Sequence, residues 1–262
     1  MSGEEHSALF PGIVENADAQ GRVLLVCEHA SNYFPPVFGL LGLDAAAREA
    51  HIAWDPGALG LARGLAARLD ATLVRAQVSR LVYDCNRAPD AAGAVAERSE
   101  TWGVPGNRGL SEADRLARTQ AVYLPFHATL HDQIARRMAR GLRPVVVTVH
   151  SFTPVWHGAP RAVEFGVIHD ADTALALAVV EAAHKGTTLQ TRLNEPYSAA
   201  DDVTHTLRLQ ATPYGLTNVM LELRNDLIAT DAQQDAMAET LAGVLKSALA
   251  KTDVTTARKA SA

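Results

Sequence analysis

The sequence predicts an α/β fold in which helices cover a mostly parallel sheet. Two runs, Arg22–Cys27 and Pro144–Val149, are apolar and β-branched almost throughout, as strands buried on both faces are. Segments with helical Leu and Ala spacing alternate with these and other strand candidates, which favours a parallel sheet. With 262 residues, 48% hydrophobic and 20% charged, the chain can build one core. We expect a single domain over residues 1–262, with flexible ends at about 1–18 and 251–262.

The first third of the chain is expected to hold three extended segments and one helix. Asp55 before Pro56 is typical of an N-cap followed by proline at the first helical position, so a helix should begin there and end at Leu69. The extended segments are Arg22–Cys27, Thr72–Arg75 and a short piece at Ser79–Tyr83.

The remainder begins with a long loop at residues 88–110, rich in Gly, Pro, Ala and Arg; loops of this length are usually functional or mobile. Ser111, with acidic residues in the following turn, predicts a long helix that ends near Arg140. After the strand at Pro144–Val149, further strands are expected at Val163–Ile168, Leu189–Leu193 and Asn218–Leu223, and helices at Ala171–Ala183 and from Asp226 or Thr230 to about Leu249.

Composition excludes several classes of function. The net charge of -5 is unsuited to general nucleic-acid binding. Cys27 and Cys85 are too few for a disulfide scaffold and lie in apolar surroundings, which indicates buried thiols. The acidic N-terminus has no signal-peptide core, and no stretch reaches the roughly 20 apolar residues of a membrane helix, so we expect a cytoplasmic protein. Signature loops of serine hydrolases, nucleotide hydrolases and dinucleotide enzymes are absent.

Polar clusters follow three of the predicted strands: Glu28-His29, His150-Ser151 and Glu222 with Arg224. Parallel strands bring their carboxyl ends to one edge of the sheet, so distant residues can converge there. His and Glu are zinc ligands, a catalytic zinc activates water, and a further carboxylate can take the proton of that water. The alternative is that these are hydrogen-bonded structural residues.

His127 and His131, spaced i, i+4 on the predicted long helix, are weaker candidates for metal ligands because no HExxH glutamate accompanies them.

The stretch from Ser79 to Arg87 suits recognition of an acid group. It contains Arg80, Asp84, Asn86 and Arg87 beside apolar positions. Guanidinium groups bind carboxylates with two parallel hydrogen bonds, as a site for an amino-acid substrate requires. A surface cluster of salt bridges is the alternative interpretation.

Several short motifs in order resemble the N-formylglutamate amidohydrolase family over roughly residues 20 to 245. They are Val26–Asn32, His51–Ala58, Ser79–Arg87, Val149–Phe152, Asn194–Tyr197 and Leu221–Arg224. The resemblance implies a zinc-exopeptidase-like, three-layer α/β/α sandwich with a mixed sheet, and an amidohydrolase of histidine degradation. It further implies Zn²⁺ or another divalent metal, Glu222 as general base, Arg80 near the oxyanion, and Asn86 and Arg87 on the substrate carboxylate.

The first metal motif departs from the His-x-x-Glu of the relatives, because Asn32 stands three residues after His29 and Glu28 precedes it. Adjacent residues of a strand point to opposite faces, so Glu28 and His29 could share a metal only across a sharp turn. We therefore expect His29, His150 and Glu28 as ligands, with Asp55 in reserve. Ser151 and Arg224 are additional candidates for substrate binding.

The leading hypothesis is hydrolysis of N-formyl-L-glutamate, or a similar small acidic N-acyl amino acid, to the free amino acid and formate or another carboxylate. A second hypothesis is a related metal-dependent deacylase or peptidase whose specificity depends on the loop at 88–110. A third is a binding protein without catalysis. No nucleic-acid or membrane partner is expected, and a homo-oligomer is compatible with the sequence.

Overall fold

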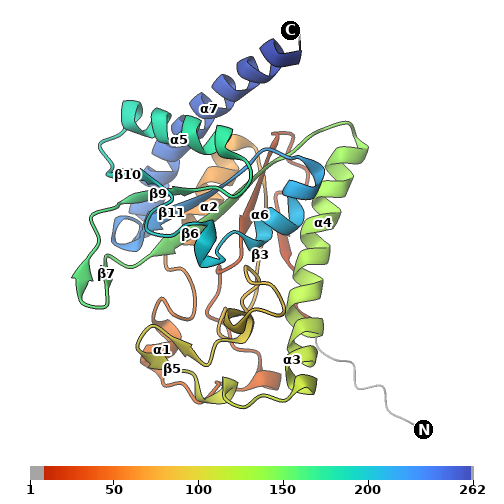
Figure 1. Cartoon of the computed structure of the whole chain (residues 1–262), viewed down its shortest axis with the longest axis vertical. Coiled ribbons are helices and arrows are strands. Elements are labelled where there is room, and N and C mark those ends of the chain that lie inside the picture. The colour runs from red at the N-terminus through yellow and green to blue at the C-terminus, as the bar shows by residue number, and fades with distance from the viewer. Residues whose placement is uncertain (1–8, 261–262) are drawn as a thin grey trace.

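A seven-stranded mixed sheet forms the centre of the computed structural model, which describes residues 9–260, and for residues 254–260 the backbone alone (Figure 1). The strand order is β1-β3-β2-β6-β11-β9-β10. Within this sheet, only the β1–β3 and β11–β9 pairs are antiparallel. The predicted α/β class with a mostly parallel mixed sheet is therefore confirmed. The strand bounds are β1 Ile13–Glu15, β2 Val23–Cys27, β3 Thr72–Arg75, β6 Val145–Phe152, β9 Phe165–Ile168, β10 Thr191–Leu193 and β11 Asn218–Arg224.

Helices cover both faces of this sheet. Alternate residues of β2, β6 and β11 pack against α2, α5 and α7 on one face, and the intervening residues pack against α4, α6 and long connecting segments on the other. The result is three layers, with α7 projecting beyond the body at its C-terminal end (Figure 1). The helices are α1 Ala45–Glu49, α2 Ala58–Leu69, α3 Glu112–Arg118, α4 Leu124–Ala139, α5 Thr173–Gly186, α6 His205–Gln210 and α7 Asp231–Ala260.

The helix predicted at Pro56 begins two residues later, at Ala58. Gly57 is its N-cap in a left-handed conformation (φ 81°), and a Cβ there would lie 2.3 Å from the carbonyl oxygen of Ile228. Asp55 therefore makes no side-chain cap, contrary to the prediction, and its carboxylate is free to point elsewhere. The prediction of an extended segment at Ser79–Tyr83 was also wrong. It is a turn in which Ser79 Oγ donates a hydrogen bond to the Ala53 carbonyl.

Other predicted elements are present with altered ends. The long helix begins with a capping box between Ser111 and Asp114 and consists of α3, a π-helical turn at Thr119–Tyr123, and α4. α7 passes its predicted end at Leu249 and continues to Ala260. The ends predicted to be flexible were about 1–18 and 251–262. Residues 1–8 and 261–262 lie outside the described residues, and β1 lies within the predicted N-terminal end.

The long loop at 88–110 has short elements of its own. The small strands are β4 Arg98–Ser99 and β5 Trp102–Gly103 in this loop, and β7 Val155–Trp156 and β8 Ala159–Pro160 after β6. The 3₁₀ turns are Pro36–Phe38, Ala92–Val95, Pro105–Asn107, Ala199–Asp201, Thr212–Tyr214 and Asn225–Leu227. Within residues 9–260, no helix combines the length and the apolar character needed to traverse a bilayer.

Candidate metal centre and active site

The polar clusters predicted at strand ends do converge at the carboxyl edge of the sheet. β6 and β11 are parallel neighbours, and their register places Glu222 opposite His150. His29 lies just beyond the end of β2, which pairs with the other side of β6. These three residues, with Asp55 and Arg80, line one cavity of about 370 Å³. Residues more than a hundred positions apart are therefore brought together by strand order alone.

Three donor atoms in this cavity lie at the spacing that a single cation requires. The Nδ1 atoms of His29 and His150 are 3.2 Å apart, and Asp55 Oδ2 lies 3.3 Å from the first and 2.9 Å from the second. Ligand atoms about 2.0–2.2 Å from a tetrahedral zinc ion lie roughly 3.3 Å from one another. The Ser151 backbone N–H donates to the same Asp55 oxygen (3.2 Å), which orients the carboxylate.

Each imidazole also has a carboxylate at Nε2, the ring nitrogen that faces away from Asp55. His29 Nε2 donates to Asp84 Oδ1 (2.8 Å), and His150 Nε2 lies 3.2 Å from Glu28 Oε2. An ionised carboxylate only accepts, and Asp55 is one as well, so the hydrogen of a neutral ring can lie on either nitrogen. With a cation between the Nδ1 atoms and Asp55, the hydrogen of each ring would lie on Nε2, toward Asp84 or Glu28. Three lone pairs this close repel one another unless protons or a cation lie between them. Carboxylate–histidine pairs of this kind support the ligands of many protein-bound metals.

The electrostatics of these groups favour a cation. Burial opposes ionisation, yet neighbouring imidazoles and the Arg80 guanidinium hold the pKa of Asp84 well below its usual value, and the imidazoles lower the pKa values of Glu28 and Asp55. Burial likewise opposes charge on His150, but Glu28 and Asp55 raise its pKa well above the ordinary value. The buried carboxylates thus draw positive charge to the Nδ1 atoms, and the donor set of two imidazoles and a carboxylate fits zinc.

The third member of this group is Asp55, the reserve candidate, and not Glu28. Glu28 lies behind His150, at the nitrogen that faces away from Asp55, and does not reach the point where the donor atoms meet. Glu28 and His29 lie in a turn just after β2, and only His29 contributes an atom to the converging group.

Glu222 is the buried acid of the cavity. Only 4% of the residue is exposed, and its Oε2 atom has no hydrogen-bond partner among the described residues. Burial raises its pKa to about 7, with Asp55 adding to the effect and His150 opposing it. A carboxyl group with this pKa can take and return a proton near neutral pH.

The arginines of the Ser79–Arg87 stretch line the same cavity, but Asn86 is already engaged. Arg80 places Nη2 2.8 Å from Asp84 and Nη1 3.5 Å from Asp55. Arg87 donates to the Asp201 carbonyl (2.9 Å). The Asn86 amide donates to the Val203 carbonyl and accepts from a backbone N–H of α6, so it holds that segment while the residue also lines the cavity.

The two other substrate-binding predictions are not supported by the geometry. Ser151 donates through Oγ to the Pro56 carbonyl (2.8 Å), so its hydroxyl anchors the turn before α2. Arg224 pairs with Asp226 and Glu164 and donates to the Arg161 carbonyl. Neither residue lines the cavity.

Sequence reasoning missed several residues of the cavity wall. Glu100, in the long loop, contacts His51 and so attaches the β4–β5 hairpin to the site. Arg98, Trp156 and Tyr197 complete the wall. Tyr197 had a signal in the sequence as the last residue of the Asn194–Tyr197 motif, and Arg98 and Glu100 lie in the loop that was expected to determine specificity.

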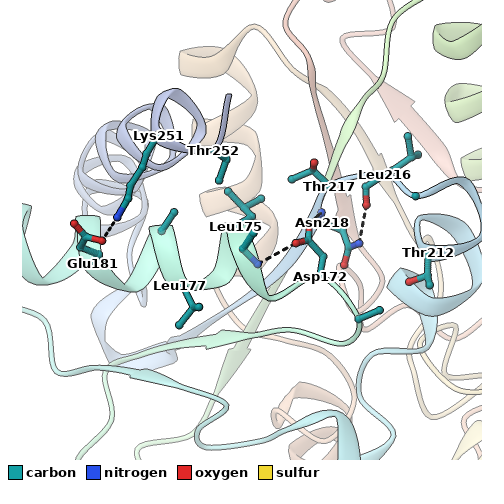
Figure 2. Close-up of a pocket in the computed structure, with 14 residues that line it drawn as sticks. Asp172, Leu175, Leu177, Glu181, Thr212, Leu216, Thr217, Asn218, Lys251 and Thr252 are labelled. Atoms are coloured by element: carbon teal, nitrogen blue, oxygen red, sulfur yellow. Dashed lines mark hydrogen bonds and ion pairs between the residues drawn. The ribbon is translucent and has the colours of Figure 1, made fainter. Parts of the chain in front are cut away.

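A larger cavity of about 660 Å³ lies at the other end of β11, between α5 and α7 (Figure 2). Leu175 forms part of its wall, and Glu181 and Lys251 form an ion pair there. It adjoins Asn218 at the start of β11, whereas Glu222 lies near the end of that strand. None of its described lining residues is a histidine, so we place the candidate site in the smaller cavity.

Comparisons with known proteins identify the family of this chain. The family model of N-formylglutamate amidohydrolase matches residues 21–229. The crystal structure of a gene product from Agrobacterium tumefaciens is 52% identical, with a TM-score of 0.91, covering 93% of this chain and 96% of that one. That of N-formylglutamate amidohydrolase from Ralstonia eutropha JMP134 is 18% identical with a TM-score of 0.62, covering 91% and 97%, which supports the fold alone. No curated protein sequence gives a significant match.

Proposed function

The chain belongs to the N-formylglutamate amidohydrolase family, and we propose that it hydrolyses N-formyl-L-glutamate, or a closely similar N-acyl amino acid, in a metal-dependent reaction. Membership makes it a hydrolase of an amide bond. The observation that carries the proposal is the position of Glu222, a buried acid with a pKa near 7, opposite His150 and beside three converging donor atoms.

His29, Asp55 and His150 would hold the divalent cation, for which their donor set favours zinc. When bound there, the ion would polarise the acyl oxygen and lower the pKa of a water molecule toward neutrality. With the ion bound at the Nδ1 atoms, the hydrogen of each imidazole would lie on Nε2, where Asp84 faces His29 and Glu28 faces His150.

Glu222 moves the protons of the reaction. As a carboxylate it takes a proton from the water that attacks the acyl carbon, and it then gives this proton to the leaving nitrogen as the C–N bond breaks. The products are the free amino acid and the carboxylic acid of the acyl group. Because burial keeps the pKa of Glu222 near 7, the group can act in both directions.

The charges on the cavity wall support an acidic substrate. Arg87 and Arg98 both line the cavity, and within the described residues each donates to backbone carbonyls and not to a carboxylate side chain. Two guanidinium groups without an acidic partner suit a ligand with two carboxylates, as N-acyl glutamate has. A volume of about 370 Å³ is in the range of small-ligand pockets.

The test is release of formate from N-formyl-L-glutamate by the zinc-loaded protein, beside N-acetyl-L-glutamate, N-acetyl-L-aspartate and short peptides. We expect formylglutamate to have the largest kcat/KM, and Glu222→Gln to lower kcat by about 10³-fold while zinc content stays unchanged. Arg87→Ala should mainly raise KM for the diacid substrates. Turnover of none of these amides by zinc-loaded protein would overturn the proposal.

A related deacylase with another acyl preference is the second candidate. The loop at 88–110 contributes Gly93, Ala96 and the Arg98–Glu100 segment to the cavity wall, so its sequence can select the acyl group or the amino acid. The same panel decides, since preference for an acetylated amino acid or a peptide would favour this reading.

A further inference from the structure

Arg161 is held in an aromatic cage at the edge of the active-site cavity. Its guanidinium carbon lies 4.7 Å from the ring centre of Trp156, 5.0 Å from that of Tyr197 and 5.3 Å from that of Phe152. Its Nη2 atom donates to the Tyr197 hydroxyl at 2.9 Å. Arg161 immediately follows the β7–β8 hairpin, and none of the reaction steps described above uses it.

The direction of this hydrogen bond determines what Tyr197 can do. A guanidinium group has donors and no acceptor, so the Tyr197 oxygen must accept from Arg161. The hydroxyl hydrogen of Tyr197 must then point to another acceptor. Tyr197 lines the cavity, and among the described residues no acceptor for its hydroxyl hydrogen is found, which leaves the cavity as the direction of donation.

The segment that carries Tyr197 packs directly over the catalytic strand. Gly166 of β9 pairs with Glu222 of β11. A Cβ at Gly166 would lie 2.2 Å from the Glu195 carbonyl oxygen and 3.2 Å from the Cβ of Glu222, so the two segments meet there without space for a side chain. Tyr197 follows two residues after Glu195 and therefore enters the cavity on the Glu222 side.

The proposed reaction also needs a hydrogen-bond donor to the acyl oxygen, and this donor must not already be paired with another acceptor. Both terminal nitrogens of Arg80, the residue expected near the oxyanion, face the carboxylates of Asp55 and Asp84. A guanidinium shared between two anions is a weaker donor to a third acceptor. The Tyr197 hydroxyl accepts a charge-assisted hydrogen bond from Arg161, and its own hydrogen has no such competition.

We propose that Tyr197 donates a hydrogen bond to the acyl oxygen of the substrate as negative charge develops there, and that Arg161 is a positioning residue that fixes this hydroxyl. The inference rests on the proposed amide hydrolysis.

The same arrangement gives Arg224 a role that differs from the predicted one. Arg224 donates to the Arg161 carbonyl (3.1 Å) and pairs with Glu164, so it holds the cage from outside the cavity.

The test compares Tyr197→Phe with Tyr214→Phe, which removes the same hydroxyl from an exposed tyrosine outside the cavity. On the best amide substrate of the wild type, Tyr197→Phe should lower kcat by about 10²-fold and change KM little, as loss of one oxyanion donor does. Tyr214→Phe should match the wild type. A kcat for Tyr197→Phe within a few-fold of wild type, or a change confined to KM, would overturn the assignment.

Arg161 is tested by two substitutions. Arg161→Met keeps the packing against the rings but removes the donor, and should lower kcat with little change in KM, by less than Tyr197→Phe does. Arg161→Lys, which can still donate to the Tyr197 oxygen, should recover most of the loss. A wild-type kcat for Arg161→Met would show that Arg161 acts only through packing, and a defect in Arg161→Lys as large as that in Arg161→Met would contradict its role as a donor to Tyr197.

Binding of a tetrahedral anionic analogue, an N-phosphoryl glutamate, provides a measurement without turnover. Zinc-loaded Tyr197→Phe should bind it about 10²-fold more weakly than wild type, and unchanged affinity would contradict the proposal. The two failures are distinguishable, because a wild type that hydrolyses no amide refutes the proposed function, whereas turnover that survives in Tyr197→Phe refutes only the role of Tyr197.

Discussion

Within residues 9–260 the buried histidines form two pairs, and their neighbours give the two pairs opposite chemistry. His29 and His150 have carboxylates at both ring nitrogens. The second pair, His127 and His205, has neutral partners. His127 Nε2 donates to the Cys85 carbonyl (2.9 Å) and its Nδ1 faces the Gln210 amide, while His205 contacts the Tyr123 hydroxyl (2.8 Å).

The pKa values follow from these partners. Burial lowers the pKa of His127 to about 4, and no nearby carboxylate compensates fully. Burial likewise lowers the pKa of His205. In the first pair the carboxylates outweigh burial and raise the pKa values of both histidines. Burial of an imidazole is therefore no evidence of a metal site, and carboxylates that orient it are the informative feature.

The largest difference should appear when the same substitution is made in each pair. His150→Gln removes a donor atom from the converging group and should abolish high-affinity zinc binding together with activity. We expect a loss of about 10³-fold or more in kcat/KM, because a metal contributes several kcal/mol to stabilising the transition state. The measurement is zinc content by elemental analysis together with formate release.

His127→Gln is the matched control. It should keep the hydrogen bond to Cys85, full zinc content and most of the activity. If His127→Gln lost zinc as completely as His150→Gln, the distinction between the two pairs would be wrong.

A smaller effect is expected from the carboxylates behind the ligands. Asp84→Asn and Glu28→Gln leave the three donor atoms in place but weaken control of which nitrogen carries the hydrogen. Loss of such a partner typically costs 10–100-fold in metal affinity. Competition with a chromophoric chelator measures this change, and Gln210→Met, beside His127, is the corresponding change in the second pair. Affinities within two-fold of wild type in both carboxylate variants would remove Glu28 and Asp84 from the support of the metal.

The sequence predicted the members of the first pair but not their partners. His29, His150 and Glu222 follow apolar runs, and parallel strands bring such positions to one edge, so their convergence could be foreseen. Asp55 was predicted as a helix cap and only in reserve as a ligand, because Asp before Pro is typical of an N-cap. The left-handed Gly57, which makes α2 begin two residues after Pro56, has no local signal. Glu28 was ranked before Asp55 because it adjoins His29 in the sequence, but both residues follow the end of β2, in a turn whose side-chain directions the sequence does not show.

The substrate wall was less predictable still. A motif locates Asn86, but whether its amide is already bonded depends on α6, more than a hundred residues later. Arg161 lies in an irregular connection with no periodicity, and only its contacts with Phe152, Trp156 and Tyr197 identify it. Strand patterns therefore predict the centre of this site, and tertiary contacts determine its rim.

The two regions should also give metal-free protein opposite responses to pH. Glu222 has a raised pKa, so between its unfolded value of 4.5 and its folded value of about 7 the folded state keeps a proton that the unfolded state loses, and stability falls as pH rises. His127 has a lowered pKa, so between 6.5 and about 4 the unfolded state gains a proton that the folded state does not, and stability falls as pH falls. With these values, Glu222 accounts for about 2 kcal/mol of lost stability from pH 5.5 to 8, and His127 for about 2 kcal/mol from pH 7 to 5. The measurement is the free energy of unfolding of zinc-free protein by denaturant, as a function of pH. Its fall toward alkaline pH should be smaller in Glu222→Gln, and its fall toward acid pH should be smaller in His127→Gln. Profiles parallel to wild type in both variants would contradict the assigned protonation states.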